Sequence, residues 1–268
     1  MARELTVIVP TFRRPALVVE AVQSALAQGG CVLEVLVVDD APDGQTRKAL
    51  EAIDDPRVAY HPRTSSSQCR PALVRQEALP LAQGQLVAFL DDDDRIAPGG
   101  YQRLVDELAA HPDAAMAFGK IEPFGATGAA MAHEVAWFLD AAHRARRAQW
   151  SGKRFLVASL LFDGSLFVTS AAMFRRARLT ALGLPDLETD GAWALDLAAR
   201  AARAGGCRFV DQLVAHFRVD ASLRIPALQA PDRLRRSYQA MHRSYRARHG
   251  FAELAGLKIF ARTLKRWL

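Results

Sequence analysis

Four consecutive carboxylates stand at the end of an apolar segment. Residues 85–90 have the length and composition of a buried parallel strand, and residues 91–94, all aspartate, follow directly. Because like charges this close repel, a core strand that ends in them calls for a compensating cation. Mg²⁺ and Mn²⁺ prefer such oxygen ligands and share them with substrate phosphates. The pattern predicts a divalent-metal and phosphate site, and a solvated acidic turn before Pro98 is the alternative.

Two earlier apolar runs also end in polar residues. Residues 5–10 are followed by Thr11, Phe12 and two arginines, and residues 32–38 are followed by two aspartates. Residues 15–28 between these runs have helical spacing, and a Gly-Gly pair ends them. Residues 70–82 form a second predicted helix that leads into the acidic strand. Strand, helix and strand with short connections imply parallel crossovers, so we expect the three strand ends to meet at one sheet edge.

These segments resemble successive signatures of one enzyme family. Residues 7–14, 37–44 and 89–94 are similar, in order and spacing, to motifs of the family 2 inverting glycosyltransferases. Arg75-Gln76 stands where that family usually has Arg-Asn, and Gly84 precedes the acidic strand. The resemblance is ordered over residues 4–125, looser over 126–225 and absent after about 230. It implies the GT-A fold, an α/β fold with a Rossmann-like, mostly parallel central sheet flanked by helices.

The resemblance also implies an activity and a metal. Such enzymes transfer a sugar from a nucleoside-diphosphate sugar, here expected to be a UDP-sugar, to an acceptor hydroxyl by single displacement. Asp91 and Asp93 match the family's Asp-x-Asp motif, with Asp92 as an added carboxylate in the middle. Asp93 is expected to contact Mn²⁺ or Mg²⁺, and Asp91 to face the ribose, the metal or a metal-bound water. Either Asp92 or Asp94 points inward, depending on a one-residue register.

The donor site follows from the same resemblance. Phe12 could stack on the base, Asp39 or Asp40 could accept a hydrogen bond from it, and arginines could reach the base or the phosphates. For Asp39 the alternative is a cap on the following turn. Arg13 and Arg14 are more often solvated than ligating. The residues assigned to nucleotide binding are Pro10, Thr11, Phe12, Arg13, Asp39, Asp40, Arg70, Arg75, Asp91 and Asp92.

A catalytic base is expected in the second half of the chain. Inverting transfer needs a carboxylate to take the proton of the acceptor hydroxyl, and the family places this Asp at a helix start. Asp190 stands at the predicted start of a helix that ends at Gly205, although this spacing is about one turn longer than usual. Asp196, with Arg200 after it, is the competing base. The alternatives are an N-cap for Asp190 and a water-facing position for Asp196.

A second metal ligand is expected near residue 220. The family often has Tyr-Arg-x-His there, and its His can bind metal. Asp220 occupies the position of that His, and His216 is a further candidate ligand.

Composition agrees with a cytoplasmic enzyme. Half of the 268 residues are hydrophobic, which suffices for a full core. The three cysteines of the chain are widely spaced and suggest neither a disulfide framework nor a zinc site. Residues 1–4 lead directly into the first strand, so no signal peptide is expected. We expect a GT-A domain over 1–231, with a nucleotide-binding half over 1–125 and an acceptor half over 126–231.

The remaining segment, residues 232–268, is a basic helical extension. It holds ten Lys or Arg against Asp232 and Glu253, and apolar residues recur every three or four positions. Such a helix can lie on an anionic membrane, here at the inner face. Alternatively, it packs on the catalytic domain or on a second subunit of a homodimer.

Two other functional classes fit parts of the sequence. A nucleotidyltransferase acting on a sugar phosphate also gathers carboxylates around a metal, but it usually opens with a glycine-rich loop that residues 10–14 lack. A basic nucleic-acid-binding protein would use the net charge of +6. Four carboxylates at the presumed cleft oppose nucleic-acid binding.

Overall fold

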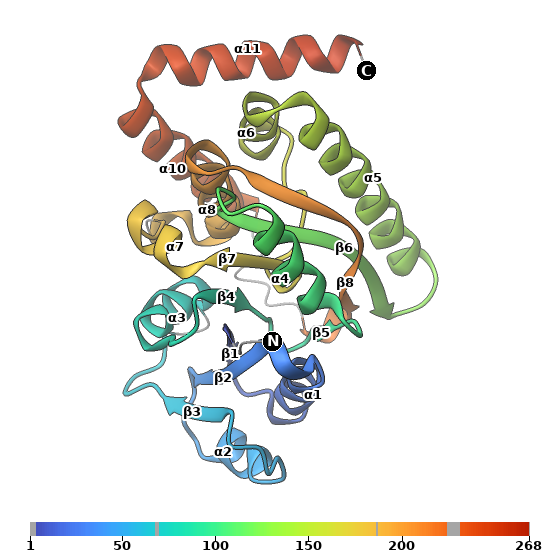
Figure 1. The fold of residues 1–268 in the computed structure, drawn as a ribbon, viewed down its shortest axis with the longest axis vertical. Helices are drawn as coiled ribbons and strands as arrows, with labels where there is room; N and C mark the ends of the chain where they lie inside the picture. Colours follow the sequence, from blue (N-terminus) through green and yellow to red (C-terminus); the bar gives the residue numbers. More distant parts are fainter. Residues whose placement is uncertain (1–3, 68–69, 186, 224–230, 268) are drawn as a thin grey trace.

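The computed structural model describes residues 4–67, 70–185, 187–223 and 231–267 (Figure 1). Its eight-stranded sheet has the order β3-β2-β1-β4-β7-β6-β8-β5. The strands are β1 (Leu5–Thr11), β2 (Val32–Asp39), β3 (Val58–Pro62), β4 (Leu86–Phe89), β5 (Arg95–Ile96), β6 (Met116–Gly125), β7 (Ala172–Arg175) and β8 (Cys207–Val219). The α-helices are α1 (Pro15–Leu26), α2 (Gln45–Leu50), α3 (Pro71–Ala78), α4 (Gly100–Ala110), α5 (Ala129–Ser151), α6 (Lys153–Phe162), α7 (Arg176–Leu182), α8 (Trp193–Ala204), α10 (Pro231–His249) and α11 (Phe251–Trp267).

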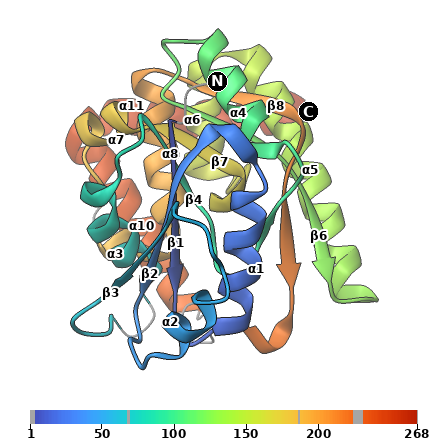
Figure 2. The same cartoon turned by 60° about the horizontal axis from the view of Figure 1, so that its bottom comes forward.

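The first half of the sheet is parallel, as the three apolar runs predict. β1 lies between β2 and β4, with Val7 opposite Val35 and Ala88, and all three side chains are fully buried. α1 and α3 lie on opposite sides of β1 (Figures 1 and 2). Gly84 allows β4 to begin beside β1, because a Cβ there would lie 2.4 Å from the carbonyl oxygen of Glu4. The carboxyl ends of β1, β2 and β4 therefore share one edge.

The second half of the sheet is mixed. β7 runs antiparallel to both β4 and β6, while β6 and β8 are parallel. The two-residue strand β5, which follows the four aspartates, pairs antiparallel with the end of β8, so that Ile96 lies opposite Ala215. This long-range pairing brings the residues after β8 to the acidic loop.

The C-terminal helices pack on the rest of the chain. Met241 and Tyr245 of α10 and Leu257 of α11 are buried in the main hydrophobic cluster. α10 contacts η4 (Leu187–Ala192), and α11 packs against α6. The predicted apolar stripe of α11 extends to Leu264 and Trp267, whose side chains lie outside the described residues. Within the described chain, the search for a helix long and apolar enough to cross a membrane finds none.

Candidate active site

A cavity of about 530 Å³ opens at the shared carboxyl edge of β1, β2 and β4. It brings together segments from both halves of the chain. Its lining consists of Pro10, Thr11, Phe12, Arg14, Asp40, Arg70, Pro71, Val74, Arg75, Asp91, Asp92, Asp93, Glu134, Phe217, Arg218, Asp220 and Leu223. We therefore take this cavity as the candidate active site.

The acidic loop turns its four side chains in different directions. Asp91, Asp92 and Asp93 line the cavity, whereas Asp94 is 1 % exposed and points into the body of the protein. Asp94 accepts hydrogen bonds from Ser170 Oγ at 2.6 Å and from the backbone N–H of Arg218 at 3.0 Å. The register that the sequence left open is thus decided: Asp94 is the inward residue, and Asp92 is buried at the wall of the cavity.

Asp91 is held by its neighbours. One carboxylate oxygen accepts a hydrogen bond from Arg75, and the other accepts one from Thr169 Oγ1 at 3.1 Å. Arg75 is itself buried, with its guanidinium 5.6 Å from the ring centre of Trp193. These contacts fix Asp91 at the cavity edge.

Electrostatics in the loop favour a cation. Burial, with the charges of Asp91 and Asp92, raises the pKa of Asp93 to about 6. Burial also raises the pKa values of Asp92 and Asp94. For Asp92 the nearby Arg14 offsets only part of this rise. A cation bound beside these buried carboxylates would favour their charged forms.

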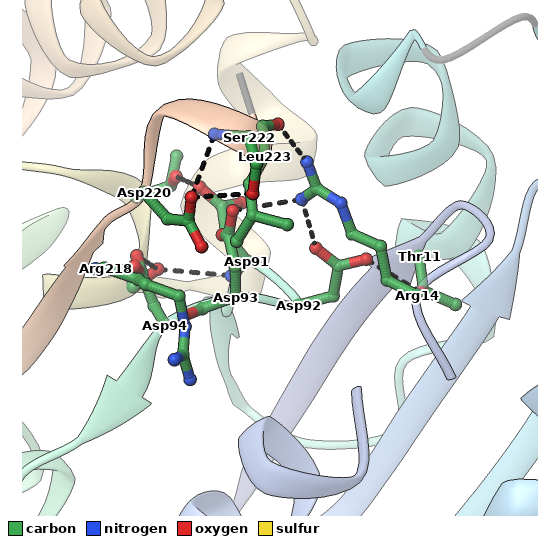
Figure 3. A network of polar contacts seen from close by, with 12 residues as sticks. Thr11, Arg14, Asp91, Asp92, Asp93, Asp94, Arg218, Asp220, Ser222 and Leu223 are labelled. Carbon is green, nitrogen blue, oxygen red and sulfur yellow. Dashed lines mark hydrogen bonds and ion pairs between the residues drawn. The ribbon is translucent and has the colours of Figure 1, made fainter. Parts of the chain in front are cut away.

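Two cavity arginines were missed from the predicted site. Arg14 Nη1 lies 2.9 Å from Asp92 Oδ1 and 3.0 Å from Asp93 Oδ2, and its other terminal nitrogen donates to the Leu223 carbonyl (Figure 3). Arg218 Nε donates to the Asp93 carbonyl at 2.9 Å. The sequence favoured a solvated Arg14. The only signal near it is Pro15, which begins α1 directly after Arg14.

The structure divides the predicted nucleotide-binding residues. Pro10, Thr11, Phe12, Asp40, Arg70, Arg75, Asp91 and Asp92 line the cavity, whereas Arg13 and Asp39 are absent from its lining. Arg13 is exposed and lies over the outer side of Phe12, 5.3 Å from the ring centre.

Asp39 is fully buried beside the cavity. It accepts hydrogen bonds from Tyr60 Oη at 2.9 Å and from the Ala41 N–H at 3.0 Å. The second contact is the turn cap that the sequence left as the alternative.

The two candidate bases have different surroundings. Asp190 lies in η4, before α8 begins at Trp193, so the predicted helix start was three residues early. Its Oδ2 accepts a hydrogen bond from Arg233 of α10 and lies 3.8 Å from Nε of Arg70, a cavity residue. Its buried Oδ1 has no hydrogen-bond partner among the described residues. Because Ala192 precedes α8 as its N-cap, Asp190 is no simple cap.

Asp196 lies away from the cavity. It sits in the first turn of α8, 1 % exposed, in a buried ion pair with Arg200. Arg200 also donates to the carbonyls of Gly183 and Leu184. The water-facing alternative for Asp196 does not hold, because α8 packs against α6 and α7 and the Asp196 side chain is buried.

The structure also separates the two candidate ligands after β8. Asp220 lines the cavity, and its carboxylate accepts hydrogen bonds from the backbone N–H and the hydroxyl of Ser222 (Figure 3). His216 is not a lining residue, and its ring packs edge-on against Phe124. Within the described residues no three His, Cys, Asp or Glu side chains already form a metal-binding cluster.

Comparisons with known proteins agree with this geometry. The family described as "Glycosyl transferase family 2" matches residues 6–181. The succinoglycan biosynthesis protein ExoO of Rhizobium meliloti is 33% identical over 107 residues, which are 40% of this chain and 30% of that protein. A Campylobacter jejuni protein named GalNAc(5)-diNAcBac-PP-undecaprenol beta-1,3-glucosyltransferase is 34% identical over 106 residues, 39% of this chain and 34% of its own. The matched segments thus span about a third of these relatives.

Solved structures identify the fold. The S. aureus TarS fragment 1–349 in complex with UDP superposes with a TM-score of 0.61 at 18% identity, covering 91% of this chain and 65% of that one. The same fragment in complex with UDP-GlcNAc gives 0.62 at 16% identity, covering 89% and 64%. The curled, mostly parallel sheet with its acidic strand end is therefore a GT-A fold. The chain belongs to glycosyl transferase family 2.

Proposed function

We propose that this protein transfers a sugar from a nucleoside-diphosphate sugar to an acceptor hydroxyl by single, inverting displacement. The observation that carries the proposal is the cavity in which Asp91, Asp92 and Asp93 meet Arg14, Arg75 and Arg218 at the carboxyl ends of parallel strands. A diphosphate with its counter-ion needs both kinds of charge. Family membership and the UDP and UDP-GlcNAc complexes of TarS support a UDP-sugar as donor.

A divalent cation fits the residues of the cavity. Asp91, Asp93 and Asp220 all line the same cavity, and a cation there would offset the burial and like charge that raise the pKa of Asp93. The described residues form no three-carboxylate cluster, which is compatible with Mg²⁺ or Mn²⁺, since such an ion keeps several waters and uses one or two carboxylates plus phosphate oxygens. We propose Asp93 as the direct ligand, with either Asp91 or Asp220 as the second carboxylate that would hold it. Bound there, the ion would neutralise charge on the departing diphosphate.

Donor orientation falls to the residues around the acidic loop. Phe12 and Pro10 offer an apolar wall against which a base can lie, and Asp40 closes that side of the cavity. Arg75 holds Asp91 in place, and Arg70, whose side chain is 39 % exposed, can reach a phosphate.

Asp190 is the base that we propose. Its Oδ1 has no hydrogen-bond partner among the described residues and can accept a proton, and Arg233 fixes the other oxygen. Its contact with Arg70 places it next to the cavity rather than within the lining. An acceptor hydroxyl that enters past Arg70 would meet this carboxylate, since such contacts often tighten only when substrate is bound.

Calorimetric titration tests the donor site. We expect one of the UDP-, GDP- and dTDP-sugars to bind with micromolar affinity in Mn²⁺, and EDTA to remove that binding. Two variants are titrated in the same way. Asp93→Ala removes a proposed metal ligand, and Asp106→Ala removes an exposed carboxylate on α4 and is the matched control. If no nucleotide sugar binds to the folded protein, or if EDTA has no effect, the donor proposal or its metal requirement fails.

A further inference from the structure

The outer face of α11 carries the two most exposed large hydrophobic side chains among the described residues. Phe251 is 71 % exposed and Ile259 is 65 % exposed. They are eight residues apart, and at about 100° per residue they point within about 80° of each other. α11 itself lies at the outer edge of the molecule, at the top of Figure 1.

The same face is basic. Lys258 and Arg262 are exposed and lie on the helical face of Phe251 and Ile259. Glu253, the acidic residue of α11, points to the body of the protein, where it pairs with Arg203 at 2.7 Å. Among its described side chains, this outer face therefore combines apolar groups with positive charge and has no carboxylate.

Packing of the domain does not account for this face. The opposite side of α11 supplies the contacts to α6, with Leu257 1 % and Ala261 5 % exposed. Phe260 lies beneath the guanidinium of Arg154 of α6, at 5.6 Å. The side chains of Phe251 and Ile259 stay 71 % and 65 % exposed beside these contacts.

A basic cavity adjoins the face. A space of about 270 Å³ between α10 and α11 is lined by Gln239, His242, Arg243, Arg246 and Leu254. Leu254 lies one turn before Lys258, so the cavity opens beside the exposed face. Its lining adds two cations, of which Arg243 pairs with Glu188 at 3.0 Å and Arg246 is exposed.

We infer that this face of α11, residues Phe251, Lys258, Ile259 and Arg262, binds the surface of an anionic lipid bilayer. Apolar side chains enter the headgroup region, and cations are drawn to acidic lipids; each signal alone is weak, and together they hold a peripheral protein. Nucleic acid would use the cations but leave Phe251 and Ile259 in water. The inference goes beyond glycosyl transfer and does not depend on it.

Vesicle flotation of the full chain tests the inference. We expect partition onto phosphatidylcholine vesicles that contain phosphatidylglycerol, weak partition onto phosphatidylcholine alone, and a fall with added salt. Phe251→Ser with Ile259→Ser should lower partition about tenfold, and Lys258→Gln with Arg262→Gln should lower it roughly tenfold as well. Leu81→Ser is the matched control. It makes an equally polar change at a 45 % exposed leucine outside α11, and it should leave partition unchanged.

Three results would overturn the inference. The first is a folded wild-type chain that does not bind anionic vesicles. The second is vesicle partition that stays the same when Phe251 and Ile259 are changed to serine. The third is a concentration-dependent dimer that the same change converts to a monomer. Calorimetric titration of the same variants with nucleotide sugar distinguishes a loss of lipid binding from a loss of donor binding, because the face lies outside the cavity lining.

Discussion

At the scale of single residues, Asp92, Asp93 and Asp94 of the acidic loop each have different surroundings. Asp94 ties the loop to η3 (Thr169–Ala171) and β8 through Ser170 and the N–H of Arg218. Asp92 accepts hydrogen bonds from Thr11 and Arg14 of the β1–α1 turn. Asp93 faces the cavity, where burial and the charges of Asp91 and Asp92 raise its pKa to about 6.

The Asp93→Ala variant should therefore lose metal-dependent turnover without losing the fold. We expect kcat/KM to fall by about 10²-fold or more, because charge on the leaving group is no longer neutralised. The melting temperature of the metal-free protein should stay the same or rise, since one of several like charges is removed. Steady-state kinetics and thermal melts measure both quantities. Undiminished turnover would rule out Asp93 as the metal ligand.

The two helical-region aspartates should respond in opposite ways to the same substitution. Asp190→Asn should spare donor binding and lower kcat by about 10²–10⁴-fold, because the proton acceptor is lost. Asp196→Asn should instead break the buried pair with Arg200 and cost about 3 kcal/mol of stability, or roughly 6–12 °C in melting temperature. Kinetics and melting of both variants decide the matter; a stable Asp196→Asn protein with no transfer activity would move the base to Asp196.

At the scale of elements, α10 packs on η4, the segment that carries Asp190. Arg233 contacts Asp190, Ser237 Oγ accepts from the Gly191 N–H at 3.1 Å, and Arg243 pairs with Glu188 at 3.0 Å. Three residues of α10, spread over ten positions of the helix, thus hold η4. Gly191 permits this approach, because a Cβ there would lie 3.2 Å from Ser237 Oγ.

Loosening this contact should impair transfer more than donor binding. Arg233→Ala should lower kcat by about tenfold or more with little change in donor affinity, because a small displacement of Asp190 misaligns it with the acceptor. Arg233→Lys should recover part of the loss. Arg236→Ala, an exposed arginine one turn along α10, is the control. Equal kcat for Arg233→Ala and Arg236→Ala would show that α10 does not position the base.

At the scale of the whole molecule, ligand and metal should stabilise the fold together. Both half-sheets contribute to the cavity, so ligand bound there links β1 and β4 to the end of β8. At a hundred times its dissociation constant, a nucleotide sugar with Mn²⁺ should add about 2.7 kcal/mol, or roughly 5–11 °C in melting temperature. Either component alone should give a smaller shift in a thermal melt. Additive, independent shifts would argue against a shared site.

The amino-acid sequence was sufficient for the parallel half of the fold and for the edge that bears the site. Apolar runs of strand length, a helix between them and short connections leave few topologies, because crossovers are right-handed and ligands gather at carboxyl ends. For that reason Asp91, Asp92 and Asp93 could be expected at this edge, where they line the cavity together with Thr11 and Phe12. Their positions depend on neighbours that are close in sequence or fixed by the crossover rule.

Contacts between distant segments decided the rest. Pairing of β5 with β8 brings Asp220 and Arg218 to the acidic loop, and it leaves His216 outside the cavity lining. Arg14 turns inward because Asp92, Asp93 and Leu223 offer partners, whereas the adjacent Arg13 stays in solvent. The sequence by itself determined the family and the acidic strand end, since local patterns encode strands and turns. Only tertiary structure decided which charged side chains meet, because that depends on contacts between distant segments, such as those of Arg14 with residues 78 and 209 positions away.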